Sequence, residues 1–179
     1  MRREIITMQR VKKYAELDEC GKRRFWELMQ EYLPDCDPDQ VRDCCEEYGE
    51  AYCAVENAEG VVGVIFGWPR RVVVSDDSSF SLDGIAVEEK WHRKGYGRLL
   101  IQAMEKAAAL YHCDSISVGS AGGYVEEFYI ANGFIPRTYK IYKDGAITVA
   151  REFQGMEDYR TYQRPAEDGF VVLDKPIGQ

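Results

Sequence analysis

The residues whose types and spacing best suit a chemical task form the run 92–98, His-Arg-Lys-Gly-Tyr-Gly-Arg. Glycine lets the backbone turn tightly and approach a ligand closely, and successive N–H groups in such a turn form a concave anion site. A helix predicted to begin near Gly97 would add free N–H groups and the positive end of its dipole. Lys90 adds a cation beside the run, in a chain of formal net charge -8. The pattern predicts a small anionic ligand, although a strand-to-helix connection with solvated charges fits the same residues.

Two other phosphate-binding motifs fit this run less well. A dinucleotide-binding loop needs a third glycine, but Leu100 stands three residues after Gly97. Such a loop also follows its strand directly, whereas residues 88–92 separate Val87 from the glycines. A P-loop is excluded because no Gly-Lys-Ser or Gly-Lys-Thr follows. A dinucleotide-binding oxidoreductase is therefore the least favoured function for this chain.

Three segments, in the same order, resemble the GNAT family of N-acetyltransferases. LDGIAV at 82–87 is similar to the family's fourth strand, and HRKGYG resembles its acyl-CoA pyrophosphate loop, usually written Q/R-x-x-G-x-G/A. FYIANGF at 128–134 resembles the helix end that carries a tyrosine four residues before a glycine. The resemblance covers about Phe80 to Phe134. It departs from the family at His92, where Gln or Arg is usual, and at Gly122, where many members have Asn.

The resemblance implies an α/β fold of the α+β type, with residues 1–179 forming a single GNAT-like domain. The sheet would be mixed and mostly antiparallel, with helices on both faces and a splayed pair of parallel strands that holds acyl-CoA. The donor would be acetyl-CoA, and no metal is expected. The residues that the resemblance assigns to acetyl-CoA are Ile85, Ala86, Val87, His92, Arg93, Lys94, Gly95, Tyr96, Gly97 and Arg98.

The reaction that the resemblance implies is acetyl transfer to an amine by direct attack on the thioester. A lysine-like ammonium has a pKa of about 10.4, so removing its proton at pH 7 costs about 4.6 kcal/mol, and a base is useful. Asp83 is the candidate base, because it is predicted to share a strand face with Ser81 and Ile85. A solvated or hydrogen-bonded carboxylate on a strand is the other interpretation of Asp83. The N–H near Val87 is expected to stabilise the negative charge that builds on the thioester oxygen.

Tyr129 stands where the resemblance places the acid that serves the leaving thiolate. A tyrosine pKa of about 10 exceeds the ~8.5 of a thiol, so full proton transfer is mildly unfavourable and hydrogen bonding is the contribution that we expect. The alternative is that Tyr129 has only a structural role, with its ring packed in the core and its hydroxyl at the rim of the core.

Composition bounds the partners of the chain. At 179 residues, with 45% hydrophobic and 30% charged residues, it is typical of one soluble domain. It has no apolar run of the ~20 residues that a membrane helix needs and no signal-peptide core, so the expected location is cytoplasmic. The negative charge argues against nucleic acid and membrane partners and suits a cationic amine on a small molecule or peptide. The oligomeric state stays open, a homodimer included.

Neither the cysteines nor the acidic run 35–46 indicates a metal site. The six cysteines include no C-x-x-C pair, so reduced and partly buried thiols are expected. Acidic residues occupy positions 1, 3, 5 and 12 of a calcium loop, but Gln40 stands where that loop needs glycine. Asp37 and Pro38 instead predict a helix start. The acidic run is interpreted as a rim that attracts a cationic substrate.

Hydrophobic periodicity predicts the elements that position these residues. Helices are predicted over 12–33, with a break at Gly21, and over 97–113 and 124–132. Asp144-Gly145 predicts a hairpin turn, and strand–helix–strand order over 80–120 predicts a parallel pair. Segment 154–168 and the remaining partner of strand 114–120 stay undecided. The predicted strands are 4–11, 51–57, 61–68, 80–87, 114–120, 137–143, 146–153 and 170–177.

Two function classes remain beside the oxidoreductase. The first is an N-acetyltransferase for a primary amine of a small molecule or peptide. The second is a non-catalytic acyl-CoA-binding or regulatory domain, which the departures at His92 and Gly122 keep open. Release of free CoA thiol that depends on an acceptor distinguishes the two. The sequence does not identify the acceptor.

Overall fold

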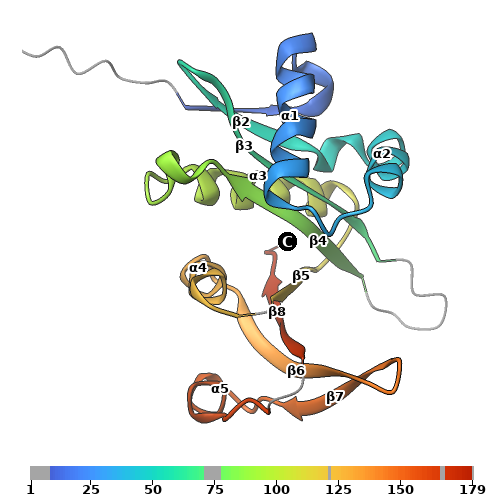
Figure 1. Cartoon of the computed structure of the whole chain (residues 1–179), viewed down its shortest axis with the longest axis vertical. Helices are drawn as coiled ribbons and strands as arrows, with labels where there is room; N and C mark the ends of the chain where they lie inside the picture. The colour runs from blue at the N-terminus through green and yellow to red at the C-terminus, as the bar shows by residue number, and fades with distance from the viewer. Residues whose placement is uncertain (1–8, 71–77, 121, 166–167, 179) are drawn as a thin grey trace, which may run out of the picture.

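One mixed sheet runs through the molecule (Figure 1). The computed structural model describes residues 9–70, 78–120, 122–165 and 168–178. The strands are β1 (Arg10–Lys13), β2 (Cys53–Asn57), β3 (Gly60–Pro69), β4 (Ser79–Val87), β5 (Ser115–Ser120), β6 (Ile135–Lys143), β7 (Ala146–Glu152) and β8 (Gly169–Pro176). Their order is β1-β2-β3-β4-β5-β8-β6-β7, and every pairing is antiparallel except β4 with β5.

Helices cover both faces of this sheet, as predicted. The helices are α1 (Glu19–Tyr32), α2 (Pro38–Glu47), α3 (Tyr96–Leu110), α4 (Tyr124–Ala131) and α5 (Met156–Thr161). Phe25 and Leu28 of α1 pack with Phe66 on one face. Leu100 and Met104 of α3 pack on the other face, in the cluster that also includes residues of α4, β6 and β8. In the described part of the chain, no helix has the length and apolar character that crossing a bilayer requires.

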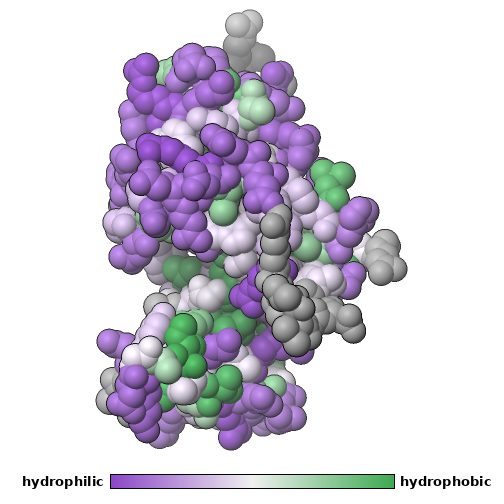
Figure 2. Space-filling view, turned by 90° about the vertical axis from the view of Figure 1, so that its right-hand side faces the viewer, coloured by the Kyte–Doolittle hydropathy of each residue, from purple (hydrophilic) through white to green (hydrophobic). Residues whose placement is uncertain are grey.

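The two parallel strands separate after a short paired stretch. Only Ser79–Ser81 of β4 pair with Ser115–Ser117 of β5, whereas β4 stays paired with β3 as far as Val87. β4 and β5 therefore diverge (Figure 1), and the space-filling view shows a hollow with apolar residues between the upper and lower parts of the molecule (Figure 2). The predicted splay of the parallel pair is confirmed.

A β-bulge interrupts β4 at Asp83. Phe66 pairs with Gly84 and Gly67 pairs with Leu82, so Asp83 is the extra residue on β4. Leu82 and Ile85 both pack in the cluster on the α3 face, which strict alternation would not allow for residues three apart. The prediction that Asp83 shares a face with Ile85 is therefore wrong. The bulge shifts the alternation and places Asp83 toward α1 and α2, where its charge acts on Cys36, Cys44 and Tyr52.

Element boundaries differ from the prediction at the N-terminal side. Residues 12–18 are not part of α1, because β1 extends to Lys13, Tyr14–Glu16 form a separate short 3-10 helix and α1 begins only at Glu19. Asp18 caps α1 by accepting a hydrogen bond of 2.7 Å from the N–H of Gly21, so Gly21 lies in the first turn rather than at a break. Most of the predicted strand 4–11 lies outside the described residues.

The C-terminal strands complete the second wall of the hollow. β8 enters between β5 and β6, which identifies the partner of β5 that the sequence left undecided. Asp144 and Gly145 have φ angles of 51° and 76°, as the predicted two-residue hairpin turn requires. The hairpin makes β7 the edge of the sheet, and α5 follows it in a segment whose structure the sequence did not indicate.

Candidate functional site

The glycine-containing loop leads into an uncapped helix. Gly95 precedes α3 in a left-handed conformation, with φ of 90°, and no side chain caps the helix. The first N–H groups of a helix have no partner within the helix, and the helix dipole favours an anion at this end. The geometry suits the anion site that the sequence predicts at residues 95–98.

Three of the four cations near this loop are available to a ligand. Arg93, Lys94 and Arg98 are exposed, and no ion pair holds them within the described ranges. The Lys94 ammonium lies 4.4 Å from the centre of the Trp91 ring. Lys90 is engaged elsewhere, because its Nζ lies 2.6 Å from Glu59 Oε2 and 3.4 Å from Glu88 Oε2. The positive charge at the loop is therefore smaller than the sequence suggests.

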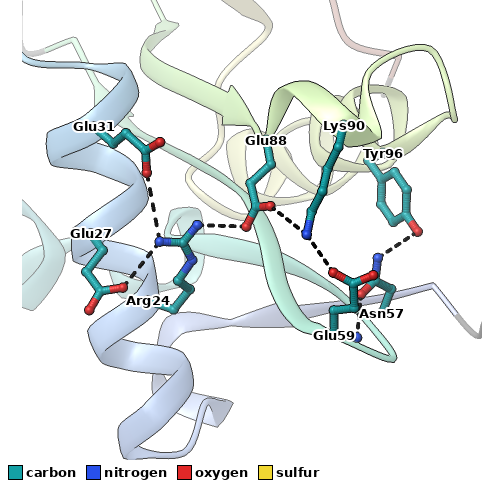
Figure 3. A network of polar contacts seen from close by, with 8 residues as sticks. All are labelled: Arg24, Glu27, Glu31, Asn57, Glu59, Glu88, Lys90 and Tyr96. Carbon is teal, nitrogen blue, oxygen red and sulfur yellow. Dashed lines mark hydrogen bonds and ion pairs between the residues drawn. The ribbon is translucent and has the colours of Figure 1, made fainter.

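A polar network ties the loop to α1 and to the β2–β3 hairpin (Figure 3). Arg24 Nη2 of α1 donates to Glu88 Oε1 at 2.7 Å, and Glu88 directly follows β4. Asn57 Nδ2 donates to Tyr96 Oη at 3.1 Å. Tyr96 is only 2% exposed, so of this residue the backbone alone is left for a ligand. The network consists of Arg24, Glu27, Glu31, Asn57, Glu59, Glu88, Lys90 and Tyr96.

The side chain of His92 holds the loop against the end of β4. Its Nε2 lies 2.7 Å from the carbonyl oxygen of Val87 and donates to it. The residue that departs from the usual Gln or Arg therefore has a structural task here. It fixes the distance between β4 and the start of α3.

Main-chain groups of β4 face the gap on alternate residues. The N–H of Glu88 donates to the carbonyl of Val62 in β3 at 2.9 Å. Because amide directions alternate along a strand, Ala86 also faces β3, whereas Ile85 and Val87 face the gap. The structure thus leaves the main-chain groups of Ile85 and the N–H of Val87 for a ligand, since His92 takes the carbonyl of Val87, and does not bring those of Ala86 to it.

Tyr129 lies in α4, the helix that borders the other side of the gap. A Cβ on Gly97 would lie 2.9 Å from Phe128 Cε2, so the glycine allows α4 to pack against the start of α3. Tyr129 is 4% exposed and packs against Phe134 at 5.3 Å between ring centres. Burial raises its pKa, so the phenol stays protonated. Over the described ranges, its hydroxyl has no hydrogen-bond partner.

Asp83 lies on the opposite face of the sheet from the Tyr129 ring. Its side chain lies on the side of α1 and α2 and is exposed to solvent. The protein atoms around the carboxyl nevertheless remove part of its hydration and so raise its pKa. Nearby thiols have raised pKa values as well, with burial raising the pKa of Cys45 to about 11. These thiols are protonated at neutral pH, which gives no support to a catalytic cysteine.

Comparison with known proteins decides the family. A family model described as the acetyltransferase (GNAT) family matches residues 22–134, which is more than half of the chain and includes β4, the loop and α4. The chain belongs to the GNAT acetyltransferase family. No curated protein matches it significantly in sequence.

Solved GNAT-like structures share the fold at low sequence identity. Ard1 from Thermoplasma volcanium is 14% identical with a TM-score of 0.66, and the match covers 96% of this chain and 99% of that chain. The NatC complex bound to Gag peptide and CoA is 16% identical with a TM-score of 0.66, and the match covers 95% of this chain and 99% of that chain. Aminoglycoside 6'-acetyltransferase type Ii is 16% identical with a TM-score of 0.63, and the match covers 95% of this chain and 98% of that chain. The mixed sheet with one parallel pair is thus the arrangement that this chain shares with acetyltransferases.

One polar cluster beside this GNAT core was not predicted from the sequence. Tyr159 of α5 and Arg164 both bond to Glu126 of α4. The segment 154–165 has no apolar periodicity, and nothing local in it indicates a contact with α4. An acidic residue on the buried side of a predicted helix was the available signal, because a carboxylate there needs partners from elsewhere in the chain.

The structure predicts which loop cations bind an anionic donor. Lys94→Met and Arg98→Met should each raise the Kd for acetyl-CoA about tenfold, since a hydrogen bond to a charged group contributes ~1.5–3 kcal/mol. Lys90→Met should change it less than about threefold, because Lys90 is held in surface ion pairs. Isothermal titration at low and moderate salt measures all three. If Lys90→Met weakened acetyl-CoA binding as much as the other two substitutions, the division between free and paired cations would be wrong.

The raised pKa of Asp83 predicts a stability effect with a definite sign. The folded state binds the Asp83 proton more tightly than the unfolded state, whose pKa is about 3.9, so ionised Asp83 destabilises the fold above its folded pKa. Asp83→Asn should therefore raise Tm at pH 7, and the gain should shrink as the pH falls toward about 4. Thermal unfolding across this range measures it, with Asp43→Asn on α2 as the exposed control. A lower Tm at pH 7 for Asp83→Asn would show that the Asp83 carboxylate is not desolvated in the folded protein.

Proposed function

We propose that this GNAT family member transfers the acetyl group of acetyl-CoA to a primary amine of a small molecule or peptide. The observation that carries the proposal is the free edge of β4 beside the uncapped start of α3. One part offers main-chain hydrogen bonds to an extended amide-containing arm. The other offers backbone N–H groups and cations to a pyrophosphate. Together they match the two ends of acetyl-CoA.

Donor binding divides between these two parts. The N–H groups at residues 95–98, with Arg93, Lys94 and Arg98, would hold the pyrophosphate. The main-chain groups of Ile85 and the N–H of Val87 would pair with the pantetheine arm. The NatC structure, which shares the fold, contains CoA, and this supports the donor.

The acceptor would enter from the face that carries α1 and α2. Asp35 and Asp83 both act on Cys36 there, so negative charge collects where a cationic amine would arrive. Tyr142, Ile147 and Val149 of the β6–β7 hairpin are exposed and apolar, and they offer a surface to an acceptor with apolar parts. The proteins that share the fold include one bound to a peptide and one named for an aminoglycoside, so both acceptor classes stay in the proposal.

The two faces of the sheet separate the proposed base, Asp83, from the proposed hydrogen-bond donor to the thiolate, Tyr129. Asp83, directly or through water, would take a proton from the ammonium. The amine nitrogen then attacks the thioester carbon, with the Val87 N–H stabilising the oxygen that gains charge. As the carbon–sulfur bond breaks, Tyr129 would donate a hydrogen bond to the thiolate. Because burial raises the pKa of Tyr129, solvent rather than Tyr129 is the final proton source.

A ligand titration followed by a turnover assay tests the proposal. Thermal shift is measured with acetyl-CoA, CoA, ATP and NADH, and a 100-fold excess over Kd should add about 2.7 kcal/mol. Free thiol release is then followed with polyamines, peptides and aminoglycosides as acceptors. Donor binding without acceptor-dependent release would favour the non-catalytic acyl-CoA-binding domain. A response to NADH alone would overturn donor binding altogether.

Tyr129→Phe tests the proposed hydrogen bond to the thiolate. The variant keeps the ring that packs on Phe134 and removes only the hydroxyl. It should lower kcat about 100-fold, at the low end of acid catalysis, while the Kd for acetyl-CoA stays the same. Tyr124→Phe, an exposed position on the same helix, is the matched control. Turnover in Tyr129→Phe equal to that of Tyr124→Phe would remove Tyr129 from the mechanism.

A further inference from the structure

Glu88, the residue directly after β4, is a junction between several parts of the fold. Its N–H donates to the carbonyl of Val62 in β3 at 2.9 Å, and its own carbonyl accepts from the N–H of Trp91 at 2.8 Å. Its carboxylate accepts from Arg24 Nη2 of α1 at Oε1, at 2.7 Å, and has Lys90 Nζ 3.4 Å from Oε2 (Figure 3). One residue thus ties the end of the donor strand to β3, to α1 and to the turn before the glycine loop.

The ion pair between Arg24 and Glu88 is more than a contact between two mobile side chains. The side chain of Glu88 is 14% exposed and that of Arg24 is 32% exposed, so water screens the pair less than it screens a fully exposed one. On its own helix, Arg24 Nη1 also lies 3.2 Å from Glu27 Oε2 and 3.9 Å from Glu31 Oε2. The guanidinium is therefore oriented from both sides, and its bond to Glu88 fixes α1 relative to β4.

A second contact holds the other end of α1 against β4. A Cβ on Gly84 would lie 2.8 Å from Leu33 Cδ1, and Leu33 directly follows the last residue of α1. The missing side chain at Gly84 is what allows the end of the helix to lie on the strand. Gly84 is also the neighbour of Asp83, the proposed base, whose side chain lies on the same face of the sheet. The end of α1 is therefore packed beside the base.

The spacing of the two contacts shows that α1 runs along β4 in the opposite direction. Arg24 and Leu33 are nine positions apart, which corresponds to a rise of about 13.5 Å in a helix. Glu88 and Gly84 are four positions apart, which corresponds to about 13 Å in a strand. Because the two lengths match, both contacts form in one register of the helix on the strand. A slide of α1 by one turn, about 5.4 Å, would break the ion pair.

This register places the two proposed substrates relative to each other. The edge of β4 is assigned to the donor, and the face with α1 and α2 is assigned to the acceptor. We propose that Arg24 and Glu88 are positioning residues, which hold α1 in register along β4 and so align the acceptor amine and Asp83 with the thioester. Both act through the elements that they join rather than on the reacting atoms. The inference rests on the proposed function.

Arg24→Met and Glu88→Gln test the pair by steady-state kinetics combined with donor titration. Each should lower kcat about tenfold, because a misplacement of ~1 Å between reactants can cost up to ~100-fold in rate. The Kd for acetyl-CoA should stay the same, since the variants keep Ile85, Val87 and the cations of the loop. Arg24→Lys keeps a cation beside Glu88 and should recover most of the lost rate.

Two control variants separate positioning from general stability. Arg23→Met changes the exposed neighbour of Arg24 on α1 and should leave both kcat and Tm unaltered. Glu56→Gln breaks an ion pair of 2.7 Å with Lys12 that joins β1 to β2, and its side-chain exposures of 35% and 20% are close to those of the Arg24–Glu88 pair. It should lower Tm by a similar amount and leave kcat unchanged.

The results that would overturn the proposal are distinct from one another. If Arg24→Met and Glu88→Gln lower Tm as Glu56→Gln does but keep the full kcat, the pair only stabilises the fold. If the Kd for acetyl-CoA rises in parallel with the loss of rate, the pair serves donor binding instead. Should Arg24→Met fail to fold by circular dichroism, Glu88→Gln decides alone. If the unmodified protein releases no CoA thiol with any amine, the proposed function fails and this role fails with it, whereas normal turnover in every variant removes only the role.

Discussion

The site depends on one constraint, which is that β4 pairs along its whole length on one side and only briefly on the other. A main-chain edge inside a protein has to find partners, and the pairing of β4 with β5 ends at Ser81 and Ser117. The polar groups beyond that point are left to water, ligand or side chains. His92 takes the carbonyl of Val87, and the remaining groups define where an extended ligand can bind.

The elements around this edge keep it open. On one side, Arg24 and Glu88 fix the end of β4 to α1, and the contact between Gly97 and Phe128 holds α4 against α3. On the other side, β5 pairs with β8, and β8 pairs with β6, so the second wall of the gap is built on these strands rather than on β4. The bulge at Asp83 then turns a carboxylate toward α1 and α2, while the Tyr129 ring packs on the α3 face. This packing keeps the Asp83 carboxylate and the Tyr129 hydroxyl on opposite faces of the sheet.

Local signals account for what the sequence predicted well. The glycine loop, β4, α3 and α4 each have turn residues, caps or periodicity within a few positions, and the family model matches the same region. The bulge was not predictable, because it is defined by the register of β3 against β4. The sequence alone could not show that Lys90 is unavailable to a ligand at the loop, because its partner Glu59 lies 31 residues earlier in the chain. The same holds for Arg164, which follows α5 and whose partner Glu126 lies in α4, 38 residues earlier in the chain.

The position of β8 also sets the order in which the protein can fold during synthesis. β5 and β6 have β8 as their common neighbour, although β8 follows both of them in the sequence. As a nascent chain leaves the ribosome, β1 to β4 can assemble early, because the strand partners of β1, β2 and β3 all lie within residues 10–87. The second wall must wait until residues 169–176 emerge. The half that contains residues 92–98 can therefore form before β8 completes the second wall of the gap.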